Sequence, residues 1–473
     1  RDWSSDVCSS DLKATVQKVN MDNNQRSNIG YLGRASYSYD DRYFFTGSYR
    51  RDGASVFGVN QKWGDFFAFG GAWRLSSEKF MSSISYLDDL KLKLSWGKNG
   101  NQGLDPYGTL STINNGASGG VRYEFGGSDI IYGLNQKALG NANLGWETTE
   151  SWNTGFESAW LGSRLFVDLD LYFSKTTDQI FTRDIPVMTG FKNMKSSMGQ
   201  VNNRGVELTI RSVNIDTQDW YWTTNLTFWL NRNKLIHLYG EDLDGDGRED
   251  DDISNSRFIG KPLGAIYGYL QDGIVQETDV EYMKANGATP GIPKYKDMDN
   301  DGVITSADRI ILGYSTPNFK LNMSNTITYK NWDLYFMLTG TFGGGGYYQK
   351  SNKGAYLTNG SGRFNTNGIY IPWWTPENKS NEYPAATFND DGGRFLGLQN
   401  RAFVRLQDVT LSYTFREPWV QKVNIQNLKV FFTAKNLFTI TKWQGGDPEV
   451  GVTVSENTYP VLTSFSLGAN ISF

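Results

Sequence analysis

The stretch DMDNDGVITSAD, residues 297–308, has oxygen-bearing side chains at the spacing of a calcium-binding loop. Such loops take ligands from positions 1, 3, 5, 7, 9 and 12, with a turn glycine at position 6, and Ca²⁺ prefers carboxylate and carbonyl oxygens. The predicted ligands are Asp297, Asp299, Asp301, the carbonyl of Val303, Thr305 and Asp308. Four carboxylates packed this closely repel one another without a cation. A solvated acidic turn built on Asp-Gly chemistry is the alternative.

The flanking residues do not predict the two helices of a calcium sensor. MKANGATPGIPKYK comes before the stretch and carries glycines and prolines that a helix interior does not tolerate. RIILGYSTPNFKLN comes after it and is typical of a turn and a strand. We therefore expect calcium to staple a long loop rather than to work a switch. An aspartate at position 12, in place of a bidentate glutamate, suits weak binding outside the cell.

A second stretch, DLDGDGREDDDI, repeats the first half of this pattern. Its predicted ligands are Asp242, Asp244, Asp246 and Asp250. Position 12 is Ile253, so this site is incomplete unless Asp251 or Asp252 folds in. An acidic surface loop is the alternative.

Other chemistry is sparse in this sequence. Trp373 and Trp374 could stack on sugar rings, or they could form a small hydrophobic cluster that packs their loop onto the rim of the β-structure. With His237 as the single histidine, no His-rich zinc site is possible. We predict no catalytic residues, although paired carboxylates for glycoside hydrolysis are not excluded among 50 acidic residues.

The first twelve residues, RDWSSDVCSSDL, look like a translated sequencing adapter and are predicted to be non-native. They hold the only cysteine, Cys8, so disulfides and thiolate sites are not expected. Residues 13–473 remain, with 52 glycines and 15% aromatic residues. This composition favours one large β-structure. The net charge of -4 argues against a nucleic-acid partner.

Strict alternation of apolar and polar residues recurs in segments of about ten residues, the length of a tilted strand that crosses a bilayer. In LFVDLDLYFS, Leu165, Val167 and Leu169 share one face, and Asp168 and Asp170 share the other. The mean hydropathy of -0.49 and the lack of long apolar runs exclude helical spans but not a membrane barrel. Inward polar residues that would line a hydrated lumen are Lys91, Lys93, Asp168, Asp170, Glu207 and Arg211.

The alternation predicts about thirteen strands. They lie near 29–39, 43–51, 63–74, 89–98, 146–159, 164–174, 201–213, 219–231, 318–329, 331–341, 401–415, 427–438 and 463–473. Every second connection is long, and the long ones include about 26 residues after Ser174 and about 86 after Asn231. One short connection holds SSEKFMSSISYL, a possible short helix. Short turns alternating with long loops indicate an outer-membrane barrel.

Aromatic residues near strand ends support the membrane interpretation over a soluble propeller or stack of sandwiches. An interfacial girdle is predicted from Trp220, Trp222, Trp229, Trp332, Tyr329, Tyr413 and Phe473. The last segment, SFSLGANISF, alternates and ends on an aromatic residue, like the terminal strand that outer-membrane assembly machinery recognises.

Six motifs, in order over residues 28–473, resemble the SusC/RagA family of TonB-linked outer-membrane importers. They are RRDGASVFGVNQKWGDFFAFGGAW, LKLKLSWGKNGNQG, WETTESWNTGFE, DMDNDGVITSADRIILGYSTP, WWTPENKSNEYP and NLKVFFTAKNLFTITKWQGGDPEV. The resemblance implies an all-β, antiparallel transmembrane barrel of 22 strands with an N-terminal plug, a signal peptide and a TonB box. About thirteen of those strands are expected here, and an odd number cannot close as a simple bacterial barrel.

The resemblance also implies a function for the complete protein. It would import glycans or peptides across the outer membrane of a Gram-negative, Bacteroidota-like cell, together with a SusD-like surface lipoprotein. Energy would come from the TonB complex through the N-terminal region, and this fragment alone is expected to be inactive. A calcium-binding secreted glycosidase or carbohydrate-binding β-protein is the alternative.

Overall fold

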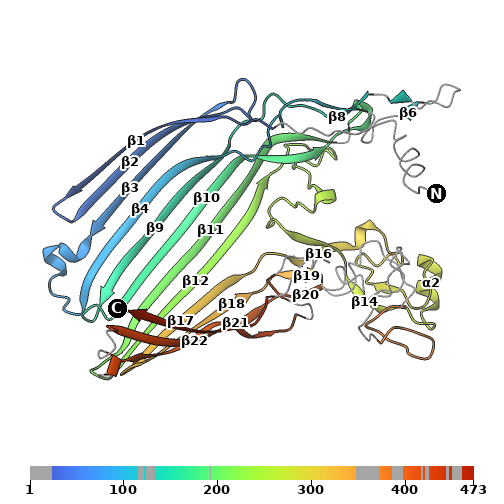
Figure 1. Ribbon diagram of the computed structural model, residues 1–473. Coiled ribbons are helices and arrows are strands. Elements are labelled where there is room, and N and C mark those ends of the chain that lie inside the picture. The colour runs from blue at the N-terminus through green and yellow to red at the C-terminus, as the bar shows by residue number, and fades with distance from the viewer. Residues whose placement is uncertain are drawn as a thin grey trace, which may run out of the picture.

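The computed structural model describes residues 24–115, 122–123, 131–132, 134–191, 193–347, 372–385, 398–416, 419–420, 425–443, 447–449 and 461–473. Residues 1–12, predicted to be non-native, lie outside them. The chain forms one antiparallel sheet of 13 strands in chain order, as predicted (Figure 1). Its strands are β1 (Asn28–Tyr39), β2 (Tyr43–Ala54), β3 (Trp63–Arg74), β4 (Leu87–Asn101), β9 (Glu147–Trp160), β10 (Leu165–Asp184), β11 (Asn193–Asp216), β12 (Trp220–His237), β17 (Phe319–Tyr329), β18 (Trp332–Phe342), β21 (Phe403–Phe415), β22 (Asn427–Thr441) and β23 (Ser464–Ser472).

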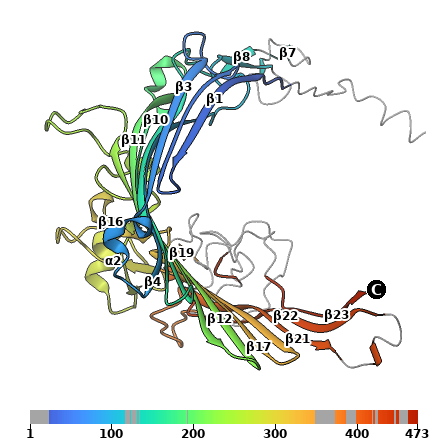
Figure 2. The ribbon, with the colours of Figure 1, turned by 90° about the vertical axis from the view of Figure 1, so that its left-hand side faces the viewer.

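The sheet bends into an open arc with β1 at one edge and β23 at the other (Figure 2). Residues that pair across strands keep one chemical character on each face. One row consists of Leu92, Phe156, Leu169, Leu208, Phe228 and Leu321. The next residue along each strand gives a row on the other face: Lys93, Gly155, Asp170, Glu207, Trp229 and Lys320. The sheet therefore has an apolar face and a face dominated by polar and charged residues, because side chains alternate along each strand.

Aromatic side chains gather where the strands meet the short turns. The ring of Trp220 lies 4.4 Å from that of Tyr329, and the ring of Trp332 lies 4.8 Å from that of Tyr413. These four residues are at strand ends, as the predicted girdle requires. Trp229 is not, because it pairs with Lys320 and Glu207 on the polar face, so its assignment to the girdle was wrong.

The longest connections all lie at one end of the sheet, although the β2–β3 and β10–β11 connections at that end, residues 55–62 and 185–192, are short. Asp40 and Asp41 turn the chain between β1 and β2 in the left-handed conformation, with φ of 52° and 51°. Residues 75–86 form two 3-10 turns, η1 (Leu75–Ser77) and η2 (Lys79–Met81), rather than an α-helix. The loop of 26 residues predicted after Ser174 was wrong, because β10 and β11 continue as a hairpin joined by residues 185–192.

Smaller elements build the long-loop end. They are β5 (Thr112–Asn115), β6 (Arg122–Tyr123), β7 (Ile131–Tyr132), β8 (Leu134–Ala138), η4 (Val187–Thr189), η5 (Ile253–Asn255), β13 (Ala265–Tyr269), β14 (Gln271–Ile274), α2 (Val280–Asn286), β15 (Pro293–Tyr295), η6 (Ser306–Asp308), β16 (Arg309–Tyr314), β19 (Gly345–Tyr347) and β20 (Leu398–Asn400). In the 238–318 connection β13 pairs with β16, and β14 pairs with β15. In the described ranges, no helix is both long and apolar enough to span a membrane.

Candidate functional site

The first aspartate loop, residues 297–308, lies between β15 and β16 in the long connection from β12 to β17. It brings together Asp297, Asp299 and Asp308, whose carboxylate oxygens lie within 4.8 Å of one another. Asp308 is fully buried, whereas Asp299 is exposed. Carboxylates at this separation could share one hard cation.

The backbone of this loop is folded around Asp297. The N–H groups of Asn300 and Gly302 donate to its two carboxylate oxygens, both at 2.7 Å. Asn300 and Gly302 have φ of 62° and 85°, in the left-handed region. Glycine reaches this region at no steric cost, which accounts for its place at position 6.

Asp308 closes the loop from its other end. The N–H groups of Met298 and Thr305 each donate to it at 2.7 Å. The N–H groups of Thr305 and Met298 hold the pKa of Asp308 below its ordinary value. At Asp299, the N–H of Asp301 acts to lower the pKa, but partial loss of hydration and the neighbouring charges of Asp301 and Asp308 outweigh it, and the pKa is raised. The loop thus gathers negative charge that a cation would relieve.

The structure does not bring every predicted ligand into this group. Asp301 lies outside it and accepts from the N–H of Val303 at 2.8 Å. The Thr305 hydroxyl accepts from the N–H of Ala307 at 3.2 Å and caps η6. The Val303 carbonyl stays a prediction. The view that MKANGATPGIPKYK holds no helix was wrong for its first four residues, because α2 runs to Asn286 and ends at Gly287 with φ of 60°.

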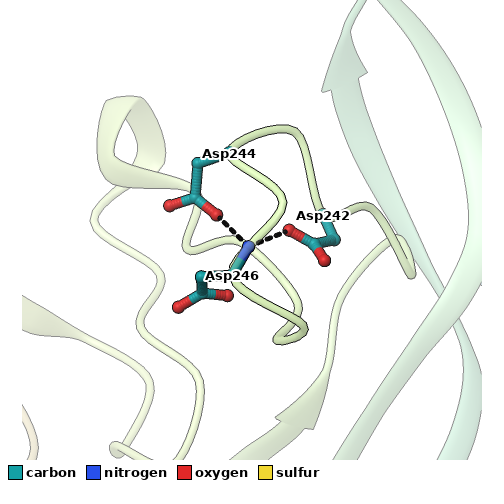
Figure 3. A group of neighbouring side chains, drawn as sticks. All are labelled: Asp242, Asp244 and Asp246. Atoms are coloured by element: carbon teal, nitrogen blue, oxygen red, sulfur yellow. Dashed lines mark hydrogen bonds between the residues drawn. The ribbon is translucent and has the colours of Figure 1, made fainter.

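The second aspartate loop, residues 242–253, brings Asp242, Asp244 and Asp246 together, again with carboxylate oxygens within 4.8 Å (Figure 3). All three are exposed. The carboxylates of Asp242 and Asp244 converge on the N–H of Asp246, which donates to each at 3.1 Å.

The remaining acidic residues of this loop are engaged elsewhere. Asp250 is not part of the group and accepts from the N–H of Leu243 at 2.7 Å. Asp251 accepts from the N–H of Ile259, and Asp252 pairs with Arg257 at 3.2 Å. Neither Asp251 nor Asp252 therefore completes the site.

The two tryptophans proposed for sugar stacking differ in exposure. Trp374 is 8% exposed, and its indole N–H donates to the side-chain oxygen of Gln276 at 2.9 Å. Nearby, the N–H of Ile274 donates to Asn381 at 3.0 Å, and that of Ala385 donates to Gly291 at 2.7 Å. Trp374 thus takes the packing alternative and clasps residues 372–385 onto the β14–β15 hairpin. Trp373 is partly exposed, and its stacking role stays a prediction.

On the polar face, one lysine joins three strands. Lys93 Nζ lies 2.9 Å from Asp168, 3.1 Å from Asp170 and 3.2 Å from Glu157, and Lys91 also pairs with Glu157. The sequence identified Lys93 and the two aspartates as lumen-facing, but not Glu157. The alternation of ETTESWNTGFE could have revealed it.

Comparisons with known proteins agree with this architecture. The family model described as TonB dependent receptor-like, beta-barrel matches residues 3–437. TonB-dependent receptor SusC of Bacteroides thetaiotaomicron is 30% identical over 461 residues, which cover 94% of this chain and 44% of that protein. TonB-dependent receptor P3 of Formosa agariphila is 29% identical over 469 residues, which cover 95% of this chain and 46% of that protein. The chain thus spans about half the length of these curated relatives.

A solved structure of the RagAB peptide importer in its open-open state matches with a TM-score of 0.76 and 23% identity. The match covers 95% of this chain and 47% of that one. At this identity the similarity shows the fold alone.

Proposed function

We infer the function from one premise: this chain belongs to the TonB-dependent receptor-like β-barrel family, whose members lie in the outer membrane. On that premise we propose that the protein containing this chain imports nutrient oligomers, either glycans or peptides. A SusD-like surface lipoprotein would present them, and the TonB complex would supply the energy. The observation that carries the proposal is the 13-stranded antiparallel sheet with one apolar face and long loops at a single end.

Each face of the sheet suits a different environment of an importer. The apolar row through Leu169 suits contact with lipid, and the charged row through Lys93 and Asp170 suits a hydrated lumen. The name TonB-dependent receptor SusC belongs to a relative, and it supports TonB-linked import without deciding between glycans and peptides. The family match favours this importer over a secreted glycosidase.

We propose that calcium is a structural cofactor of the first aspartate loop. Support comes from three carboxylates within 4.8 Å and from the raised pKa of Asp299. The ion would hold the loop rigid at the end of the sheet where substrate arrives. The second aspartate loop, with three exposed carboxylates, is the weaker candidate.

Uptake by the intact protein tests the main proposal. We expect cells to take up labelled oligomers of one class when they carry the full-length receptor with its neighbouring lipoprotein. Deletion of the receptor gene, or of the TonB gene as the matched control, should abolish uptake of that class, because transport needs both barrel and energy. Uptake that persists without the receptor or without TonB would contradict the proposal.

A further inference from the structure

A small pocket opens at the long-loop end of the sheet. Its volume is about 150 Å³. The lining residues that matter here are Ser315, Lys320, Thr341, Arg401, Phe403 and Glu449. Sites that enclose a whole small molecule measure roughly 300–1,000 Å³, so this pocket suits one chemical group of a larger ligand.

Arg401 brings a cation to this pocket without a carboxylate partner among the described residues. Its Nε and one Nη donate to the carbonyl of Pro448 at 3.0 and 2.9 Å, and the same Nη donates to the carbonyl of Glu449 at 3.3 Å. Burial lowers the pKa of Arg401, and the negative charge of Asp447 opposes this effect without cancelling it.

Lys320 is the second cation of the pocket. It lies in β17, on the polar face of the sheet. Its Nζ lies 5.9 Å from the ring centre of Trp229. Within the described ranges no carboxylate lies in salt-bridge distance of it, and the side chain is exposed. Its ammonium group can therefore reach an incoming anion.

The acidic residues near this pocket are committed to another arginine. Arg405, only 4% exposed, pairs with Asp447 at 2.6 Å and with Glu449 at 2.5 Å. Because both carboxylates are paired with Arg405, they offset the charges of Arg401 and Lys320 only in part, and Asp447 is the one that acts on Arg401. The charged residues that line the pocket are the cations Lys320 and Arg401 and the carboxylate of Glu449, which Arg405 already pairs, so the pocket favours an anion.

We propose that this pocket binds a carboxylate group of the incoming oligomer, held by Lys320 and Arg401. The carboxylate comes either from a uronic acid unit of a glycan or from an acidic or C-terminal group of a peptide. Arginine and lysine give charge-assisted hydrogen bonds to carboxylates, and these are stronger than neutral ones. This inference rests on the proposed import function and narrows its substrate class to acidic oligomers.

Binding by the purified full-length receptor, in complex with its lipoprotein, tests the proposal. The probes are hexagalacturonate against maltohexaose, and a glutamate-containing hexapeptide against its glutamine-containing, amidated counterpart. We expect calorimetry to show binding of one acidic probe and little of its neutral match, with the pair that responds identifying the source. Lys320→Gln should weaken that binding roughly tenfold, because a charge-assisted contact is lost.

Lys330→Gln is the matched control, since Lys330 directly follows the other end of β17 and also lies over an aromatic ring, at 5.4 Å from the ring centre of Tyr329. It should leave affinity unchanged. Equal affinity for acidic and neutral probes, or no effect of Lys320→Gln, overturns the inference. If uptake still depends on TonB in that case, the import function stands. Loss of TonB dependence itself would overturn both.

Discussion

The two aspartate loops begin alike and are closed differently. In each, the aspartate at position 1 accepts from the N–H groups of positions 4 and 6, at 2.7 and 2.7 Å for Asp297 and at 2.7 and 2.9 Å for Asp242. Positions 4 and 6 are left-handed in both loops. The shared half of the sequence pattern thus encodes one turn.

The closing residues set the loops apart. In the first loop, the buried Asp308 at position 12 accepts from the N–H of position 2 and joins the carboxylate group. In the second, Asp250 accepts from the N–H of position 2, and Glu249 anchors the loop by accepting from the N–H groups of Leu238 and Gly240, both at 2.7 Å. The turn is therefore set by local sequence, whereas the entry of the closing acidic residue into the carboxylate group depends on the contacts that anchor the end of the loop.

The largest expected effect is a difference in ion affinity between the two loops. Asp297→Ala should weaken calcium or terbium binding to the full-length receptor roughly a hundredfold, because a charged ligand and two turn hydrogen bonds are lost together. Terbium luminescence titration measures it. Asp242→Ala, the matched change in the second loop, should have a much smaller effect. Equal losses in the two variants would remove the distinction between the loops.

A smaller effect concerns pH. The pKa of Asp308 is lowered from its ordinary value of 3.8. The ionised carboxylate therefore stabilises the first loop fully at pH values above 3.8, and this stabilisation is lost as the pH falls below 3.8 towards the lowered pKa. Asp308→Asn should remove that dependence and speed amide exchange in the loop roughly tenfold, since one N–H partner loses its acceptor.

Hydrogen exchange with mass spectrometry measures this change, and the second loop serves as the internal control. There, burial raises the pKa of Glu249 but the N–H groups of Gly240 and Leu238 outweigh it, so the pKa is lowered. In the Asp308→Asn protein, the second loop should still lose its protection from exchange when the pH falls below 4.5, as it does in the unchanged protein. Unchanged exchange in the first loop would show that Asp308 does not close it.

The smallest expected effect is a gain. Ile253→Asp gives the second loop an acidic residue at position 12, and Ile253 is 54% exposed, so little packing is lost. We expect terbium affinity of this loop to rise roughly threefold in the Asp297→Ala background. The gain stays small because Glu249 and Asp250 still hold the loop in its present closure. A gain matching the first loop would mean that position 12 alone decides binding.

The strands could be predicted because lipid on one face and water on the other impose a period of two. That rule ends where the chain leaves the membrane. Beyond Ser174, β10 stays paired with β11 through residues such as Gln179 and Thr182, although the alternation has faded. The predicted strand ended too early, because pairing in water does not require an apolar face.

In the candidate site, only the contacts between residues close together in the sequence could be predicted. Asp297, Asp299 and Asp308 come together as one loop, and their spacing showed it. The hydrogen-bond partner of the Trp374 indole is Gln276, 98 residues earlier in the chain, so the burial of this tryptophan could not be predicted from neighbouring sequence. The basic pocket draws Lys320, Arg401 and Glu449 from different strands and connections, and only the folded sheet brings them together.

The clasp of residues 372–385 on the β14–β15 hairpin has a consequence for how such proteins diversify. Two connections far apart in the chain share Trp374, Gln276 and the Lys379–Glu277 ion pair at 2.9 Å. If only one of these two connections is exchanged between relatives, the indole N–H of Trp374 and the backbone N–H of Ile274 lose their hydrogen-bond partners. These two connections should therefore be inherited, and transplanted, as a pair.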